Sequence, residues 1–450
     1  MDVYVAPYLG QYIVYRPLKR LAFVANAALV NMIAELQNDT ARSETVGSSD
    51  AMHFLETVGF FEPDPPAPTQ LLSAAPFKPT VAVCLLTTAC NFRCVYCYAS
   101  AGEQSSKALP VDLGRHAIDI VCRNASEAGQ TQFSLSFHGG GEPTLAQRTL
   151  QTLVTYARSK ELPSKISIAS NGYWGRRQRA WILDHLDEVS LSFDGSQQLQ
   201  DRQRRLSSGK SSFPIVMETI REMERRKFQY GIRVTVTDDG IDELAGAIEF
   251  LCEETECGTF QVEPAFDHGR ARSNDLALGD NERFAAAFMQ AYDTATSYCR
   301  HLYYSGARPW VVTDRFCQAV DRALIVAPGG ALSACYEVYG PEHPLASEFF
   351  YGVLERGGGI KLEAETRERL QRKIAERRSL CQGCICYWHC AGDCPPKSIA
   401  AGEDGHRRFG ERCDLNRMIT KELLIRRIAA GNGVWRGKER EELQSFEVRA

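Results

Sequence analysis

Between residues 80 and 270 the sequence alternates six times between a short apolar segment and a longer amphipathic one. The short segments are apolar on both faces, as buried parallel strands are. They are VAVCLLTT, FSLSFHGGGEP, KISIASNG, EVSLSFDG, YGIRVTVTD and TFQVEPAF. Intervening patterns such as FPIVMETIREMERRKF predict helices. Alternating strands and helices predict a parallel sheet with right-handed crossovers, either as a partial barrel or as an open sheet.

The segments on either side lack this alternation. Residues 1–62 predict a small α+β unit, in which VYVAPYLG and QYIVYRPLKRLAFVA pair as strands and two short helices follow. A proline-rich stretch at 62–70 predicts a stiff linker, and the pattern at 364–378 predicts a charged helix. We therefore expect four parts. They are an N-terminal unit with its linker at 1–75, a barrel at 76–300, a cysteine-rich region at 301–432 and a polar, exposed tail at 433–450.

Cysteine is the outlying residue type, with 16 in 450 residues. The N-terminus lacks the basic region and apolar run of a signal peptide, and no apolar stretch is long enough to span a membrane. A net charge of −4 gives no basic field for nucleic acid or an anionic membrane. We therefore expect a soluble cytoplasmic protein. In that reducing compartment, clustered cysteines are more often metal ligands or catalytic thiols than disulfides.

Three of the cysteines follow the first strand with the spacing C-x3-C-x2-C: Cys90, Cys94 and Cys97. Three thiolates can ligate three irons of a [4Fe–4S] cluster and leave the fourth iron open to a ligand. A structural zinc site usually has four ligands arranged in C-x2-C pairs. Three cysteines that simply pack in a core are the remaining interpretation.

Other polar or glycine-rich groups end the next strands, where functional residues of such folds gather. GGGEP ends the second strand, and its glycines would let backbone approach a ligand closely. Ser170 and Asn171 end the third strand, and Asp194 ends the fourth, although Asp-Gly is also a common turn. Arg233 on the fifth strand offers a bidentate fork to a carboxylate, or a salt bridge inside the barrel.

These features together resemble the radical S-adenosylmethionine (SAM) superfamily, whose signature is C-x3-C-x-aromatic-C after the first strand, with Tyr96 in the aromatic position. The resemblance implies a partial (β/α)6 barrel and a cluster that cleaves SAM to a 5′-deoxyadenosyl radical. GGGEP resembles the family's GGEP motif, which binds the methionine ammonium group. The residues implied to contact SAM are Tyr96, Gly139, Gly140, Gly141, Glu142, Ser170, Asn171, Asp194, Arg233 and Val262. Val262 and Pro264 would flank adenine, or simply belong to a core strand.

The cysteines beyond residue 300 resemble the seven-cysteine SPASM extension of this superfamily. The match comprises Cys317, Gly330, Cys335, Cys381, Cys384, Cys390, Cys394 and Cys413. It implies two auxiliary iron–sulfur clusters, one held by Cys317, Cys335 and Cys394. The other would be held by Cys381, Cys384, Cys390 and Cys413. Two complete [4Fe–4S] clusters need eight ligands, so the first has an open iron or an unusual fourth ligand such as Cys299 or Cys386.

The resemblance covers residues 80–415 and implies a maturase that oxidatively modifies, and most often cross-links, a ribosomally made peptide. Its partners would be a precursor peptide and a reductant such as flavodoxin or ferredoxin. The N-terminal unit would bind the precursor's leader by strand addition, or serve as a structural cap. Tyr336 and Glu337 follow Cys335, where sulfatase maturases carry an aspartate base, so both are candidate catalytic residues. The alternatives are a sulfatase-maturase-like enzyme, a small-molecule dehydrogenase or oxidase and, from another class, a zinc-stabilised binding module.

Overall fold

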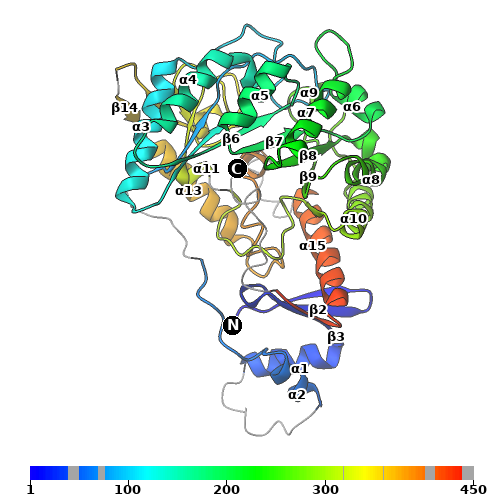
Figure 1. The fold of residues 1–450 in the computed structure, drawn as a ribbon. Helices are drawn as coiled ribbons and strands as arrows, with labels where there is room; N and C mark the ends of the chain where they lie inside the picture. Colours follow the sequence, from blue (N-terminus) through cyan, green and yellow to red (C-terminus); the bar gives the residue numbers. More distant parts are fainter. Residues whose placement is uncertain (39–49, 69–76, 318, 358, 401–410, 438–450) are drawn as a thin grey trace. The chain divides into compact units, whose positions relative to one another are not determined.

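The computed structural model describes residues 1–38, 50–68, 77–317, 319–357, 359–400 and 411–437 (Figure 1). The chain forms two compact units. The first comprises Met1–Leu71, Gly306–Phe316 and Ala375–Gln444, and the second comprises Leu72–Ser305, Cys317–Ile374 and Ser445–Ala450. The segment 301–432, which the sequence suggested as one domain, contributes to both units. The four-part division therefore stays a prediction about domains.

The six strands expected from the alternating pattern are all present in the second unit, and each pairs with the next in parallel. They are β4 (Val81–Cys84), β5 (Phe133–Phe137), β6 (Ser164–Ser170), β7 (Glu188–Ser192), β8 (Tyr230–Val236) and β9 (Thr259–Pro264). Two further parallel strands extend this sheet, β10 (His301–Tyr303) beside β9 and β11 (Ala323–Val326) beside β4. An antiparallel extension follows, β12 (Ala331–Ser333), β13 (Phe350–Leu354) and β14 (Ile360–Leu362). In the described residues β10 and β14 end the sheet, so it does not close.

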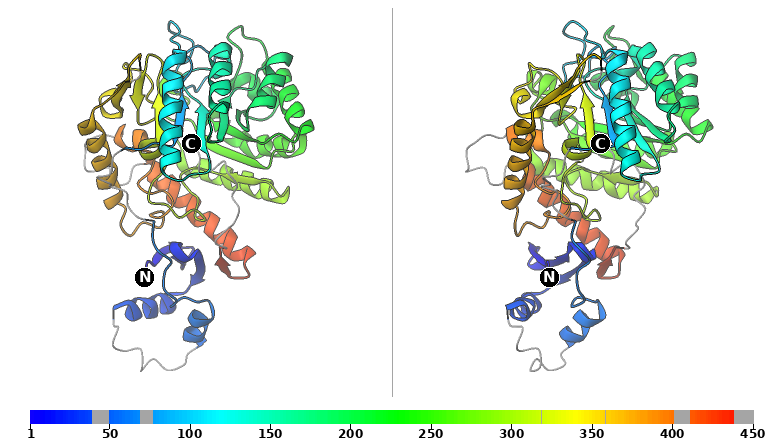
Figure 2. Two further views of the ribbon diagram at one scale, coloured as in Figure 1. Left: turned by 60° about the vertical axis from the view of Figure 1, so that its left-hand side comes forward. Right: turned by 90° about the vertical axis from the view of Figure 1, so that its left-hand side faces the viewer.

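The main helices of the second unit lie together on the outside of this sheet (Figure 2). They are α3 (Val111–Glu127), α4 (Gln147–Arg158), α5 (Arg176–His185), α7 (Phe213–Arg225), α8 (Leu244–Glu254) and α10 (Asn281–Ser297). Each buries one apolar stripe at helical spacing; in α7 it contains Val216, Ile220 and Met223. The shorter helices are η2 (Pro143–Ala146), α6 (Gln197–Gln203), η3 (Asp238–Glu243), α9 (Gly269–Ser273), α11 (Ala319–Arg322) and α12 (Ala346–Phe349). The predicted charged helix is α13 (Ala364–Ser379).

The first unit contains a four-stranded antiparallel sheet in the order β1-β2-β3-β15. Its elements are β1 (Tyr4–Tyr8), β2 (Gln11–Arg16), η1 (Pro17–Lys19), β3 (Leu21–Ala25), α1 (Ala27–Asn38), α2 (Asp50–Thr57), α14 (Pro395–Ala400), α15 (Glu411–Ala430) and β15 (Val434–Arg436). The expected strand pair is thus three strands, because Pro17 starts a short helical turn and Arg20 is left-handed at φ 49°. Both expected helices, α1 and α2, are present.

The sequence predicted a polar, exposed tail from Gly433 onward. This prediction is wrong for the first residues of the tail. Val434–Arg436 forms β15, which pairs with β3, and Trp435 is only 5% exposed. Its ring lies 6.1 Å from that of Tyr15, and the guanidinium of Arg427 lies 5.5 Å from it. A three-residue strand is too short to show a period, so the sequence pattern did not reveal it. Residues 438–450 lie outside the described residues.

None of the described helices is both long enough and apolar enough to cross a membrane.

Candidate active site

The loop at 90–97, which carries the first three cysteines, is held by an antiparallel stretch at 203–207. Three backbone hydrogen bonds between 2.8 and 2.9 Å join the two segments, and Phe92 and Leu206 form a β-bridge. The loop therefore has defined backbone partners despite its irregular conformation. Among the described residues no three His, Cys, Asp or Glu side chains converge on a single metal ion. The ligands of a [4Fe–4S] cluster bind separate irons, so they need not converge in this way.

The glycine run after β5 lies directly against this loop. Gly139 and Gly140 both have φ of 72°, a left-handed conformation that glycine adopts without strain. A Cβ on Gly141 would lie 2.1 Å from the carbonyl oxygen of Ala89, the residue before Cys90. The run thus brings backbone close to the predicted cluster ligands, and this cradle fits a cofactor that contacts both segments.

Glu142 connects the glycine run to the end of β6. Its Oε1 accepts hydrogen bonds from the Ser170 hydroxyl at 2.7 Å and from both the hydroxyl and the backbone N–H of Thr144. Its Oε2 accepts from the backbone N–H of Asn171 at 2.9 Å, and the Asn171 amide donates to Asn91 Oδ1 at 2.9 Å. Burial raises the pKa of Glu142, and these donors oppose the rise. The structure thus brings together the residues predicted after the second and third strands and the cysteine loop.

Tyr96 and Asp194 also meet, in a buried network that the motif alone does not predict. The Tyr96 hydroxyl donates to Asp194 Oδ2 at 2.7 Å, and the backbone N–H of Thr235 donates to Oδ1 at 3.2 Å. Arg204, which directly follows α6, donates to the Tyr96 hydroxyl at 2.7 Å. Burial raises the pKa of Asp194, whereas Arg204 opposes the rise most strongly. Both Asp194 oxygens have protein partners, so its predicted contact with ribose or substrate competes with this network.

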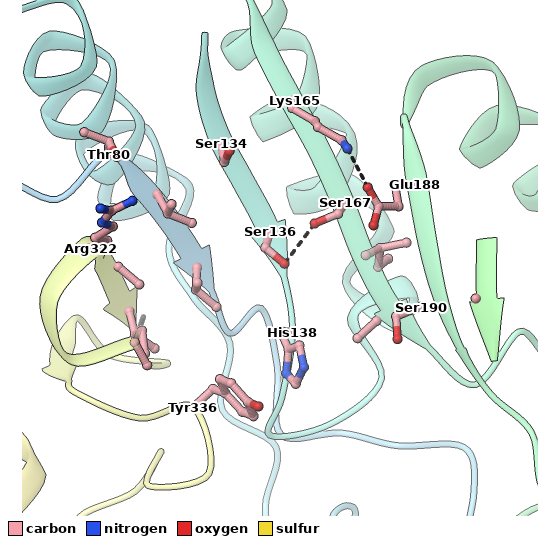
Figure 3. A pocket seen from close by; sticks show the side chains of 18 of the residues that line it. Thr80, Ser134, Ser136, His138, Lys165, Ser167, Glu188, Ser190, Arg322 and Tyr336 are labelled. Atoms are coloured by element: carbon pink, nitrogen blue, oxygen red, sulfur yellow. Dashed lines mark hydrogen bonds and ion pairs between the residues drawn. The ribbon is translucent and has the colours of Figure 1, made fainter. Parts of the chain in front are cut away.

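A cavity of about 510 Å³ lies along the inner face of the sheet, opposite the helices (Figure 3). Strands β4 to β11 all contribute lining residues, so the sheet curls around the cavity. Barrels are normally filled by bulky branched side chains, whereas here the polar lining includes Ser134, Ser136, Ser167 and Ser190. Small side chains therefore leave room for a ligand, and the volume is typical of ligand sites.

Arg233 and Tyr336 line this cavity, whereas Val262 does not. Val262 is fully buried and alternates along β9 with Gln261, which faces the cavity, so its side chain points to the helices. The expected contact of Val262 with adenine stays a prediction. Burial alone would lower the pKa of Arg233, but Tyr336 and acidic neighbours including Glu337 raise it overall. Arg233 thus has protein partners for its charge.

His138 is a cavity residue that the sequence did not single out. It directly precedes the glycine run, and its ring centroid lies 4.1 Å from that of Tyr336 at a tilt of 42°. Figure 3 shows both rings at the end of β5. Burial, with a second contribution from Arg233, lowers the pKa of His138 to about 4, and its buried Nδ1 has no hydrogen-bond partner. Serine alternates with apolar residues along β5, which places Ser134 and Ser136 on the inner face. This alternation is the sequence signal that could have identified His138 as a cavity residue.

The cysteines of the first unit form a second group. A cavity of about 20 Å³ is lined by Cys381, Cys384, Cys386, Cys390 and Cys413, together with Gly392, Asp393, Asn416 and Arg417. The four ligands predicted for the second auxiliary cluster therefore lie together. Arg377 donates to Cys413 Sγ at 3.1 Å, and the Asn416 amide donates to Cys390 Sγ at 3.3 Å. Both are interactions that favour thiolate ligands.

The predicted ligands of the first auxiliary cluster belong to different units. Cys317 and Cys335 are in the second unit, where Cys317 packs against the same apolar cluster as Tyr336. Cys394 is in the first unit, immediately before α14. Of the two candidates for a fourth ligand, Cys386 lines the other cysteine cavity and Cys299 is exposed at the end of α10.

Residues 84–251 match the model of the Radical SAM superfamily. This part of the chain belongs to the radical SAM superfamily. A radical SAM domain implies SAM and a [4Fe–4S] cluster as cofactors. The maturation protein SkfB of Bacillus subtilis (strain 168), which acts on sporulation killing factor, is 29% identical over 43% of this chain. The chain spans only 44% of the length of SkfB.

Two other relatives cover more of the chain. A serine-type anaerobic sulfatase-maturating enzyme of Klebsiella aerogenes is 24% identical over 77% of this chain and 86% of its own length. Among solved structures, anSMEcpe with bound AdoMet and a Cp18Cys peptide superposes with a TM-score of 0.60 at 16% identity. That superposition covers 79% of this chain and 99% of anSMEcpe. It shows the expected fold, a partial barrel.

Proposed function

We propose that this chain is a maturase that oxidatively modifies, by cross-linking, a ribosomally synthesised peptide. The observation that carries the proposal is the 510 Å³ cavity, which opens along the sheet that also holds the cysteine loop and the glycine run. A side chain of an extended peptide is of a size to enter such a cavity. The similarity to SkfB, and to a solved relative bound to a peptide, supports a peptide substrate.

Each group of residues would have a distinct role in the reaction. Cys90, Cys94 and Cys97 would hold the cluster, and the glycine run would leave space for SAM beside it. The bound SAM and cluster would supply a 5′-deoxyadenosyl radical, which abstracts a hydrogen atom from the substrate. The residues that line the cavity would orient the substrate for that abstraction.

A net oxidation also requires that the substrate lose a proton and an electron. Tyr336 and Glu337 were the sequence-based candidates for the proton acceptor, and Tyr336 lines the cavity. Burial raises the pKa of Tyr336 well above its ordinary value, so its hydroxyl is protonated and is itself no base. We therefore assign proton acceptance to Glu337 or to the neutral imidazole of His138. The predicted auxiliary clusters supply an electron acceptor when bound.

The proposal is tested with anaerobically reconstituted protein, SAM, a reductant and, as candidate substrates, any short peptides that are found to be encoded near this chain's gene. We expect 5′-deoxyadenosine and a peptide that has lost two hydrogens, and neither from a C90A/C94A/C97A variant. Formation of 5′-deoxyadenosine with a peptide of unchanged mass would reject oxidation of that peptide. Colourless protein that binds zinc and no iron would support the binding-module alternative instead.

One observation favours a second candidate function. The sulfatase-maturating relative covers most of its own length and of this chain. Against it, Cys335 is followed by Tyr336 rather than by an aspartate. A synthetic peptide carrying a sulfatase serine or cysteine motif separates the two functions, because only a sulfatase-type enzyme would convert that residue to an aldehyde.

We also propose that the N-terminal sheet binds the leader of the precursor peptide, and the order of its strands limits where the leader could add. β15 covers the β3 edge, so the edge strands of this sheet among the described residues are β1 and the three-residue β15, and the longer β1 is the candidate for strand addition. The two-residue turn that joins β1 to β2 makes Tyr8 and Gln11 a hydrogen-bonded pair, so the outward-facing residues are Pro7 and Val5. Pro7 has no N–H to donate. A leader strand would therefore depend on the N–H of Val5.

A further inference from the structure

Arg233 lines the 510 Å³ cavity without a hydrogen-bonded partner for its guanidinium. Within the part of the chain that the structure describes, no hydrogen bond or ion pair reaches this side chain. Tyr336 and the acidic neighbours that raise its pKa act without such a bond. Gln261, which pairs with Arg233 across β8 and β9, already binds Glu263 at 2.9 Å and Tyr303 at 3.2 Å through its amide. A guanidinium has five N–H donors, so those of Arg233 are available to a ligand.

The charges along the cavity favour an anionic ligand. Among the described residues that line it, Glu188 is the only carboxylate, and a 2.7 Å ion pair with Lys165 neutralises it (Figure 3). The other two charged lining residues, Arg233 and Arg322, are both cations. Arg322 is exposed and precedes β11, at the end of the cavity away from His138, whereas Arg233 lies within β8. Water and salt screen an exposed charge more than an enclosed one, so Arg233 attracts an anion more strongly.

His138 and Tyr336 add two polar groups close to Arg233. Their rings lie 4.1 Å apart, and Arg233 is near enough to lower the pKa of His138, after the larger effect of burial. The buried Nδ1 of His138 has no hydrogen-bond partner, and the Tyr336 hydroxyl forms no hydrogen bond with another described residue. A neutral imidazole has one N–H and a phenol has one O–H. With the guanidinium, these groups place three donors and no carboxylate around one end of the cavity.

We propose that Arg233, together with His138 and Tyr336, binds a carboxylate of the substrate, so that the modified residue has an acidic side chain or is the C-terminal residue of the peptide. A guanidinium binds a carboxylate through two parallel hydrogen bonds, which fix its orientation as well as its position. The residue is thereby oriented for hydrogen-atom abstraction. This inference rests on the proposed function, because it names the class of residue that the enzyme oxidises.

The test measures the binding of capped amino acids to SAM-loaded, anaerobically reconstituted enzyme by ligand-detected nuclear magnetic resonance. N-acetyl-glutamate methylamide carries a side-chain carboxylate, and N-acetyl-glutamine methylamide is its neutral isostere. N-acetyl-alanine carries only a C-terminal carboxylate, and its methylamide is the neutral control. In one of these two pairs we expect the carboxylate probe to bind about tenfold or more tightly than its control, and that pair identifies the source of the carboxylate. A wild-type enzyme that prefers neither carboxylate would overturn the proposal without any variant.

Two variants assign the preference to a residue. R233Q should lose it, whereas R322Q should keep it, because Arg322 is exposed at the opposite end of the cavity. A preference that persists in R233Q would overturn the proposal. If R233Q instead lowers the affinity for SAM, Arg233 binds the methionine carboxylate, and the proposal is likewise overturned.

The outcome is independent of the test of the proposed function. Binding of the probes requires no turnover, so failure here would leave oxidation of a peptide untouched. Conversely, a carboxylate preference that depends on Arg233 would stand even if the candidate peptides kept their mass. A peptide oxidised at an internal residue with a neutral side chain would refute the inference while confirming the proposed function.

Discussion

Gly141 lies so close to Ala89 that a Cβ at this position would be 2.1 Å from the Ala89 carbonyl oxygen. It would also lie 2.7 Å from the carbonyl carbon of Thr88. Both contacts are with backbone that leads directly into Cys90. The end of β5 and the start of the cysteine loop are therefore matched in shape, and neither can move without moving the other.

Gly141→Ala should displace the loop and weaken SAM binding by about tenfold or more, since overpacking typically costs about 1–3 kcal/mol. Equilibrium binding of SAM to the reconstituted enzyme measures this effect. Gly175→Ala is the matched control, because nothing lies within 4 Å of a Cβ there and its φ is −66°. Equal affinity in G141A and wild type would show that the cradle is not part of the SAM site.

His138 predicts a pH dependence of stability. Its pKa is about 4 in the folded chain and about 6.5 when unfolded, so between these values the unfolded state binds the extra proton. The free energy of unfolding should therefore keep its full value above pH 6.5 and fall as the pH is lowered toward 4. One histidine contributes up to about 1.4 kcal/mol per pH unit to the slope of the unfolding free energy against pH.

Denaturant unfolding at a series of pH values measures this slope. The slope of H138Q should be shallower than that of wild type by up to this amount. H185Q, at an exposed position on α5, should keep the wild-type slope. An unchanged slope in H138Q would mean that His138 binds a proton equally well in the folded and unfolded states, which would contradict its lowered pKa.

Cys386 and Cys384 should differ in their effect on iron content. Cys386 is 2% exposed and donates a hydrogen bond to the Thr420 hydroxyl at 3.4 Å, which gives it a structural partner. Cys384→Ser should cost about four irons per chain, whereas Cys386→Ser should cost none. Iron analysis after anaerobic reconstitution distinguishes them. Loss of iron in C386S would make Cys386 a ligand, and an unchanged content in C299S would remove Cys299 from consideration.

Leader binding should depend on the backbone of Val5, which is 42% exposed and lies on the edge strand β1. Val5→Pro removes its N–H and should weaken binding of the precursor about three- to tenfold, the effect of one backbone hydrogen bond. SAM cleavage without peptide should not change. Val5→Thr keeps the N–H and serves as control. Equal precursor affinity in both variants would indicate a structural cap. A deletion of residues 1–70 is less informative, because it would also leave β15 without its partner β3.

The sequence predicted the six central strands because long apolar runs bounded by turn residues are a strong local signal. It missed β10 to β15 because these short strands lie outside the alternation of apolar and amphipathic segments at residues 80–270 that marked the other six. The cysteines and GGGEP are recognisable since each motif is local. Arg204 and His138 are not, because their importance depends on strand register and on contacts with distant segments. Arg204 and Tyr96 are 108 positions apart in the chain.

The fate of a labelled hydrogen tests the central claim most directly. A precursor peptide deuterated at its modified residue is incubated with reduced enzyme and SAM, and the 5′-deoxyadenosine formed is analysed by mass spectrometry. If this chain oxidises a peptide by hydrogen-atom abstraction, deuterium appears in 5′-deoxyadenosine in step with the modified peptide. Unlabelled 5′-deoxyadenosine, formed at the same rate with and without the peptide, would contradict that claim.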